Sequence, residues 1–252
     1  MEKVNLKIDA LKQLEVGFIG LGVMGYQMAA WTAKAGFSVS VYNRSSNVSE
    51  KWVKKFGGKN FSEPSELAET CDVVFICVGR DEDVLEVTSG KNGIFHTIKP
   101  GSLIVDHSTT SANLSRELGA IANQLNCNFI DAPVSGGEKG AIDGKLAIMC
   151  GGSSESFNLA KSIMECYATK ISLMGPHGSG QLCKMVNQIC IAGLLQGLSE
   201  GVNFAKNAGL DVEQVIEIIS KGAAQSWQLD NRAVTMYQDK FDFGFAVKWM
   251  RK

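Results

Sequence analysis

The sequence has few of the residues that build metal centres, disulfide frameworks or nucleic-acid surfaces. It contains 3 histidines and 7 cysteines among 252 residues. The cysteines are odd in number and none forms a CxxC pair, so we expect neither a structural zinc site nor a disulfide framework. Positive charge is not in excess, because 25 Lys and Arg face 26 Asp and Glu, for a net charge of −1. Without a basic stretch, no nucleic-acid partner is expected.

Long apolar runs are also missing. The longest apolar-rich run, residues 185–198, is interrupted by one asparagine and two glutamines, so it predicts a buried helix rather than a membrane span. The leader, residues 1–15, carries three acidic residues and lacks a long apolar core. It is therefore a poor secretory or transit signal. We expect no membrane partner and a cytoplasmic location, with the mitochondrial matrix as the alternative.

Short β-rich apolar runs alternate with helical patterns from Val16 to about Leu173. The predicted strands are Val16–Ile19, Ser38–Tyr42, Val73–Val78, Leu103–Asp106, Phe129–Asp131, Leu146–Cys150 and Lys170–Leu173. The predicted helices between them include Met24–Ala35, Ser49–Phe56, Pro64–Thr70 and Ala112–Leu125. Such alternation predicts an α/β fold with a Rossmann-type doubly wound, mostly parallel sheet that is covered by helices on both faces.

The strand pattern stops after Gly180. One long helix is predicted over Leu182–Ala208, and Asp211 is a predicted N-cap for a second helix, Val212–Lys221. We place the domain boundary near residues 175–180. The expected parts are the leader (1–15), a Rossmann domain (16–177) and an all-helical C-terminal domain (178–252).

A glycine-rich loop follows the first predicted strand. Gly20-x-Gly22-x-x-Gly25 comes directly after Val16–Ile19 and opens a helix, which is the context of a dinucleotide-binding fingerprint. The first glycine allows the tight turn, the second lets the backbone approach a pyrophosphate, and the third lets the helix pack on the strand. The alternative is a tight strand–helix turn without a ligand. The expected cofactor-binding residues here are Gly20, Leu21, Gly22, Val23, Met24 and Gly25.

The end of the second predicted strand bears on which nucleotide binds. NAD enzymes usually carry an acid there for the ribose 2′-hydroxyl. This chain has Asn43-Arg44-Ser45 instead, and no acid before Glu50. A guanidinium binds phosphate bidentately, so Asn43, Arg44 and Ser45 favour NADP(H) over NAD(H). The alternative for Arg44 is a solvated surface arginine.

Two further strand ends carry candidate residues. Val78 ends the third predicted strand of the alternating region, and Asp106–Thr109 ends the next one. Ligands of doubly wound sheets bind at these carboxyl ends, so Val78 and Thr109 are expected near the cofactor. We interpret His107 as a packed or hydrogen-bonded neighbour rather than as a general base.

A second set of motifs suggests a substrate site. The run Asp131–Gly137 places Ser135 between apolar and glycine residues, where backbone N–H groups suit a carboxylate. Lys184 and Asn187 follow Gly178-Ser-Gly180 and share one face of the long predicted helix. In their order and spacing these motifs resemble the β-hydroxyacid dehydrogenases. That family includes 3-hydroxyisobutyrate dehydrogenase, tartronate semialdehyde reductase and the glyoxylate/succinic semialdehyde reductases.

The resemblance implies specific roles. Lys184 matches the family's catalytic lysine, Asn187 its substrate-orienting asparagine, and Thr109 a position that contacts nicotinamide and substrate. The implied carboxylate-binding loop consists of Ser135, Gly136 and Gly137. A lysine serves as base for oxidation and as acid for reduction if burial lowers its pKa from about 10.4 towards 7–8.

The resemblance also bears on the end of the chain. Lys252 aligns with a family lysine that contacts the cofactor, and the sequence stops before the aspartate that follows it. We therefore expect a helical domain that is incomplete at its C-terminus.

These observations together predict an NAD(P)-dependent oxidoreductase that transfers hydride between nicotinamide and a small hydroxy acid or semialdehyde acid. The expected partners are a small carboxylate substrate and further copies of the chain, as a homodimer or homotetramer. One alternative is a non-catalytic NADP-binding relative that was disabled by truncation. Others are a 6-phosphogluconate-dehydrogenase-like or an imine-reductase-like enzyme.

Overall fold

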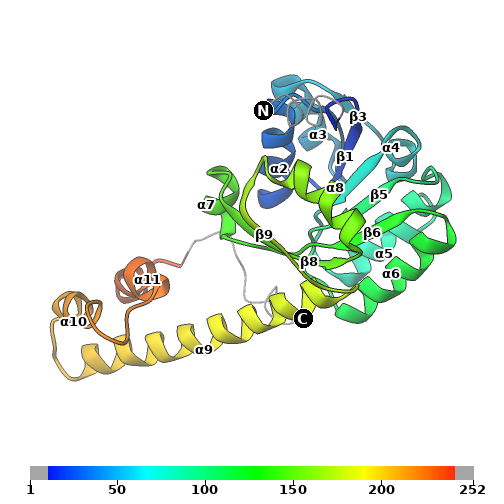
Figure 1. Cartoon of the computed structure of the whole chain (residues 1–252). Coiled ribbons are helices and arrows are strands. Elements are labelled where there is room, and N and C mark those ends of the chain that lie inside the picture. Colours follow the sequence, from blue (N-terminus) through cyan, green and yellow to red (C-terminus); the bar gives the residue numbers. More distant parts are fainter. Residues whose placement is uncertain (1–10, 242–252) are drawn as a thin grey trace, which may run out of the picture. The chain divides into compact units, whose positions relative to one another are not determined.

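The computed structural model describes residues 11–241 (Figure 1). The chain forms two compact units, of which the first extends to Lys184 and the second begins at Met185. Lys252 lies outside the described residues.

The first unit is built on one sheet. Its strands are β1 (Glu15–Ile19), β2 (Ser38–Tyr42), β3 (Lys59–Asn60), β4 (Val73–Ile76), β5 (Leu103–Asp106), β6 (Asn128–Asp131), β7 (Val134–Ser135), β8 (Leu146–Gly152) and β9 (Ala168–Gly175). The order is β3-β2-β1-β4-β5-β6-β8-β7, and β9 pairs with β8. Strands β1 to β6 are all parallel, whereas β8 runs antiparallel to β6 and β7. The order 3-2-1-4-5-6 is that of dinucleotide-binding sheets.

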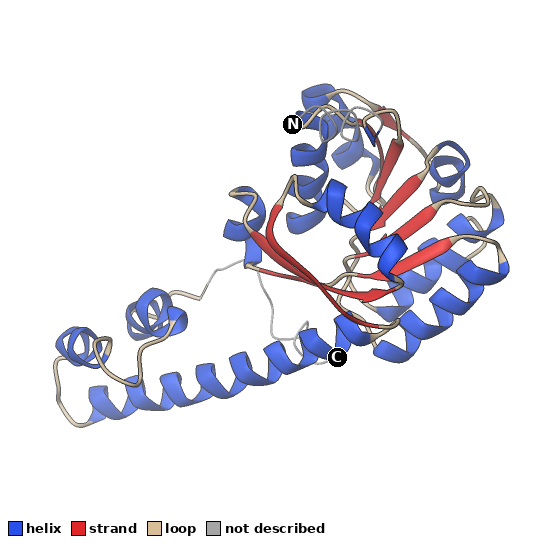
Figure 2. Cartoon of the chain, viewed as in Figure 1, coloured by secondary structure: helices blue, strands red, loops and turns tan. Residues whose placement is uncertain are grey.

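Helices cover both faces of this sheet (Figure 2). They are α2 (Val23–Lys34), α3 (Ser46–Phe56), α4 (Pro64–Thr70), α5 (Asp81–Ser89), the 3₁₀ turn η1 (Ile94–His96), α6 (Ala112–Gln124), α7 (Gly137–Ile142) and α8 (Ser154–Met164). Side chains of α2, α3 and α8 share one core cluster, and those of α4, α5 and α6 share another. Because both faces are buried, strand residues of either parity are apolar, which explains the continuous apolar runs in the sequence.

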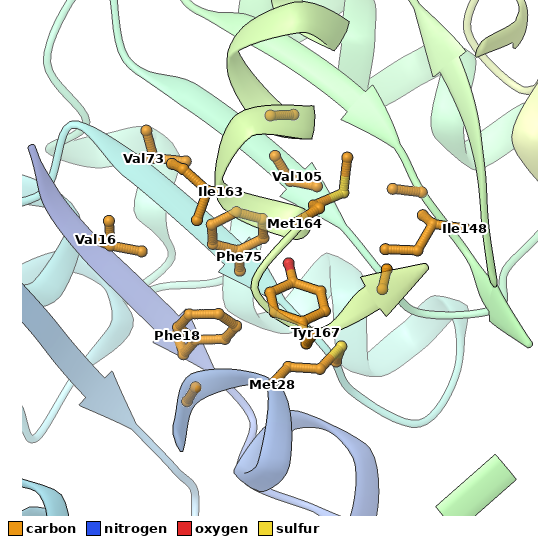
Figure 3. Close-up of a cluster of buried hydrophobic side chains, with 14 of the residues drawn as sticks. Val16, Phe18, Met28, Val73, Phe75, Val105, Ile148, Ile163, Met164 and Tyr167 are labelled. Carbon is orange, nitrogen blue, oxygen red and sulfur yellow. The ribbon is translucent and has the colours of Figure 1, made fainter. Parts of the chain in front are cut away.

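The larger cluster gathers around three aromatic rings (Figure 3). Phe18 of β1 and Phe75 of β4 stack with ring centroids 4.8 Å apart, and Tyr167 meets both edge-on. Met28 and Met164 contribute from helices α2 and α8. This packing fixes the strands whose carboxyl ends carry the candidate site.

Three helices make up most of the rest of the described chain. Helix α9 (Ser179–Asn207) starts in the first unit and continues into the second, where α10 (Val212–Ile219) and α11 (Trp227–Tyr237) follow. Asp211 caps α10 by accepting the Gln214 N–H at 3.1 Å. Within residues 11–241, no helix is both long and apolar enough to cross a membrane.

Candidate active site

The glycine loop between β1 and α2 is tightly packed on one side and open on the other. Gly20 has φ +93°, and a Cβ there would lie 2.3 Å from the carbonyl oxygen of Cys77. A Cβ on Gly25 would lie 2.0 Å from the carbonyl oxygen of Gly20. A Cβ on Gly22, in contrast, would meet no atom within 4 Å. The protein itself therefore requires the outer two glycines, and the space at Gly22 fits a close-approaching ligand.

The first turn of α2 presents its N–H groups at this open side. Gly22 is the N-cap, no side chain caps the helix, and Val23 is 48% exposed. The first N–H groups of a helix lack intrahelical partners and attract anions. Leu21 and Met24 point their side chains into the core instead. A dinucleotide pyrophosphate fits this arrangement of backbone donors.

The loop after β2 is fastened to the glycine loop. The Asn43 side-chain oxygen accepts the Leu21 N–H at 2.9 Å, and the Asn43 amide donates to the Ser45 carbonyl at 3.1 Å. The Arg44 side chain is 91% exposed, and its guanidinium lies 3.7 Å from the Asp83 carboxylate. Asn43 thus positions the loop, while Arg44 is available to a ligand in solvent.

Arg80 is a neighbouring cation that the sequence analysis did not single out. Its Nε lies 3.3 Å from Glu82 and 3.8 Å from Asp83, the carboxylate that also faces Arg44. The signal for it was its position two residues after the end of the predicted strand Val73–Val78.

The ends of β4 and β5 are joined to each other. The Val78 N–H donates to the Ser108 hydroxyl at 3.0 Å, and the Val78 side chain lies against Gly20. The Ser108 N–H in turn donates to Asp106 at 2.8 Å. Thr109 follows this bonded pair and is half-buried. Val78 and Thr109 therefore both lie at the sheet edge that carries the glycine loop.

His107 is enclosed in the core. One ring nitrogen bonds the Ala132 carbonyl at 2.7 Å and the other bonds the Tyr167 hydroxyl at 2.9 Å. Burial lowers the pKa of His107 to about 4, and the bond to Ala132 opposes this only in part. The imidazole is neutral near pH 7 and faces no solvent, as the packed-neighbour interpretation expects.

The expected carboxylate loop has a backbone that glycine favours. Ser135 is in β7 and pairs with Ala147 of β8. Gly136 and Gly137 follow with φ +130° and +61°, and both are exposed. Side chains rarely tolerate such angles, so two successive glycines are needed for this turn. The expected carboxylate loop is therefore an exposed glycine turn at the end of β7.

Helix α9 begins against β6. The buried Asp131 carboxylate accepts the Gly178 N–H at 2.7 Å and the Gln181 N–H at 3.0 Å. Burial raises the pKa of Asp131, and these two hydrogen bonds act in the opposite direction. Lys184 follows on α9 and is only 9% exposed. Asn187 lies one turn further and donates to the Gln188 side chain at 3.2 Å.

The described side chains contain no group of three or more His, Cys, Asp or Glu arranged to hold a metal ion.

Comparisons with known proteins decide the family. Residues 15–175 match the NAD binding domain of 6-phosphogluconate dehydrogenase, and residues 178–252 match the NAD-binding domain of NADP-dependent 3-hydroxyisobutyrate dehydrogenase. An uncharacterized oxidoreductase of Shewanella frigidimarina is 52% identical over 238 residues, which cover 94% of this chain and 82% of the relative. A probable 3-hydroxyisobutyrate dehydrogenase-like protein of Arabidopsis thaliana is 40% identical over 226 residues, covering 90% and 75%. The chain belongs to the β-hydroxyacid dehydrogenase family.

A solved structure agrees with this family. Mycobacterium tuberculosis 3-hydroxyisobutyrate dehydrogenase with L-serine has a TM-score of 0.85 and 27% identity, over 94% of this chain and 82% of that one. As a β-hydroxyacid dehydrogenase, the chain is an NAD(P)-dependent hydroxyacid dehydrogenase of the 3-hydroxyisobutyrate dehydrogenase type. The expected fold class and family are thereby confirmed.

Proposed function

We propose that this β-hydroxyacid dehydrogenase interconverts a small hydroxy acid and its semialdehyde acid, with Lys184 as the general acid and base. The observation that carries the proposal is the placement of Lys184. It is nearly buried on α9, and the start of that helix is bonded to Asp131, the first residue of the Asp131–Gly137 motif. Lysine side chains are mostly exposed in folded proteins, so the burial of Lys184 distinguishes it from an ordinary surface lysine.

Each further residue has one role in the proposal. The nicotinamide, when bound, supplies or accepts hydride. Lys184 gives a proton to the carbonyl oxygen as it becomes a hydroxyl, and it takes that proton back in oxidation. The N–H groups of Ser135, Gly136 and Gly137 bind the substrate carboxylate. Asn187 orients a substrate oxygen, and Thr109 contacts nicotinamide and substrate. The Mycobacterium tuberculosis relative, solved with L-serine, fits this class because L-serine is a small hydroxy acid.

We further infer a preference for NADP(H). Arg44 supports it, because its exposed guanidinium stands at the end of β2, where a ribose 2′-phosphate would be bound. The Asp83 carboxylate lies 3.7 Å from this guanidinium, so a bound phosphate would compete with it. Arg44→Ala is expected to raise the dissociation constant of NADPH far more than that of NADH, as measured by fluorescence titration. Equal losses for the two nucleotides would refute the 2′-phosphate role.

The test of the reaction uses the purified chain with NADPH or NADH and four aldehyde acids: glyoxylate, succinic semialdehyde, tartronate semialdehyde and methylmalonate semialdehyde. Turnover with one of them is expected. Lys184→Ala should lower kcat by about 100-fold or more while NADPH still binds. Lys206→Ala, at an exposed lysine of the same helix, is the control. If Lys184→Ala retained most of the rate, the proton-transfer role would be wrong.

The alternatives have their own outcomes in this test. Tight NADPH binding without turnover of any aldehyde acid would favour the non-catalytic relative. Reduction of a cyclic imine, but of no aldehyde acid, would favour the imine-reductase-like enzyme. The roles of Lys252, the two-domain division at residue 178, the cytoplasmic location and the homodimer or homotetramer stay predictions.

A further inference from the structure

Gln181 joins three motifs of the candidate active site. Its side-chain amide donates to the Ser108 carbonyl at 2.8 Å, and its side-chain oxygen accepts the Thr110 N–H at 3.1 Å. These are the backbone groups on either side of Thr109. Gln181 is fully buried, at 0% exposure, so both hydrogen bonds are shielded from water. A buried amide with both functions satisfied holds its partners in one geometry.

The backbone of Gln181 is fixed as well. Its N–H donates to Asp131 at 3.0 Å, and Gly178 donates to the other oxygen of the same carboxylate at 2.7 Å. The neighbouring Gly180 lies so close to the sheet that a Cβ there would be 2.4 Å from the Met149 carbonyl oxygen. The first turn of α9 is therefore held in one position against the sheet.

Lys184 is three positions after Gln181, so the two share one face of α9. Fixing the first turn of a rigid helix fixes the next turn. We propose that Gln181 is a positioning residue, which sets the distance between Lys184 and Thr109. This inference rests on the role proposed for Lys184, and it assigns to Gln181 a purpose beyond the stability that any buried hydrogen bond provides.

Two variants of Gln181 separate positioning from folding. Gln181→Met keeps the size of the side chain and removes both hydrogen bonds. Gln181→Glu keeps the acceptor for the Thr110 N–H and removes the amide donor to Ser108. The matched control is Ser156→Ala, because Ser156 is buried and its hydroxyl joins α8 to β6 through Asn128 at 3.2 Å.

Steady-state kinetics give the first readout. Gln181→Met is expected to lower kcat about 10- to 100-fold, because small displacements of a reacting group cost that much. Its dissociation constant for NADPH should stay within about twofold of the unchanged protein. Gln181→Glu should also lower kcat, because its carboxylate cannot donate to the Ser108 carbonyl and faces that carbonyl with an oxygen. Ser156→Ala should lower the Tm without changing kcat. An unchanged kcat in Gln181→Met, or an equal loss of kcat in Ser156→Ala, would overturn the proposal.

A second readout does not need turnover. Acetic anhydride labelling, followed by mass spectrometry of the Lys184 peptide, measures how accessible this lysine is. Release of the first turn should speed Lys184 labelling several-fold in Gln181→Met and leave Lys161 of α8 unchanged. An unchanged labelling rate would overturn the positioning role. If the unchanged protein has no turnover, the proposed reaction fails. The labelling rates still decide whether Gln181 fixes the position of Lys184. If Gln181→Met does not fold, the same labelling is read in Gln181→Glu.

Discussion

Gly22 and Gly25 stand three residues apart in one loop, and we expect substitutions at them to act for different physical reasons. A Cβ on Gly25 would lie 2.0 Å from a carbonyl oxygen, whereas a Cβ on Gly22 would meet nothing within 4 Å. Gly25→Ala should therefore lower the free energy of unfolding by about 1–3 kcal/mol, through overpacking. Gly22→Ala should change it by less than about 0.5 kcal/mol. Urea unfolding of the two variants measures the difference.

The affinity for NADPH gives a second test of the role of Gly22. The open space at Gly22 is where we expect the pyrophosphate to approach the backbone. A methyl group there should therefore raise the dissociation constant of NADPH roughly tenfold, which corresponds to about 1.4 kcal/mol. Isothermal titration of the folded Gly22→Ala protein measures this. Unchanged affinity in that variant would mean that the ligand does not lie over Gly22.

His107 predicts a pH dependence of stability. Its pKa is about 4 in the fold, against about 6.5 for an unperturbed histidine. Between these values the unfolded chain takes up a proton that the fold does not, so the free energy of unfolding falls as the pH falls from 6.5 to 4. The full loss is roughly 3 kcal/mol. His107→Gln should remove this dependence in urea unfolding measured from pH 7 to 4.

The control for His107 lies in the same chain. His96→Gln replaces an exposed histidine and should leave the pH dependence in place. Asp131 acts in the opposite direction, because its raised pKa makes the folded state hold a proton longer, so stability from this group falls as the pH rises. Because Asp131 is present in both proteins, its contribution cancels when the free energy of unfolding of His107→Gln is subtracted from that of the unchanged protein at each pH. A difference that does not vary with pH would contradict the assignment.

At the scale of elements, the sequence predicted the buried strands better than most of the short helices. β2, β5 and α4 have the bounds that the sequence predicts, because buried parallel strands show unbroken apolar runs and α4 starts at a proline. The predicted strand over Val73–Val78 ends at Ile76, and the long helix begins at Ser179 rather than Leu182. Helix α7 was missed because it begins in a glycine pair, which has no helical propensity of its own. Helix α8 was also missed, although its Ser153 N-cap is a readable signal.

Helix α7 depends on another element for its position. The Trp31 ring nitrogen of α2 donates to the carbonyls of Ala141 and Ile142, at 3.1 and 3.3 Å, near the end of α7. This contact holds the helix that begins at Gly137, directly after Gly136. Trp31→Phe should loosen the proposed carboxylate loop and raise the KM for the aldehyde acid about fivefold, the equivalent of about 1 kcal/mol. The dissociation constant of NADPH should not change.

Trp52→Phe is the control for Trp31→Phe. It removes a similar bond, from the indole nitrogen to the Tyr26 carbonyl at 3.2 Å, without touching α7. It should lower stability and leave the KM for the aldehyde acid unchanged. A KM that rises equally in both variants would show that Trp31 acts through stability alone.

At the scale of the molecule, the sequence predicted the family and the fold, while contacts between distant segments depended on the structure. Gln181 bonds to residues more than 70 positions away in the chain, at Ser108 and Thr110. No local pattern marks such a residue, because its partners come together only when β5 and the start of α9 meet in the fold. Arg44, Lys184 and Asn187 were readable since each belongs to a motif, and their roles stay predictions.

Assembly is the last property that belongs to the molecule as a whole. In the second unit, Phe204 and Ile218 are 71% and 74% exposed, and Phe204 borders an apolar groove of about 520 Å³ between α9, α10 and α11. Exposed apolar surface is typical of protein interfaces. We expect the 27.1 kDa chain to sediment as a dimer or tetramer. Phe204→Glu should shift it to a smaller species, because a carboxylate is costly to bury unpaired, whereas Lys206→Glu on the same helix should not. A monomer at micromolar concentration would refute this assembly.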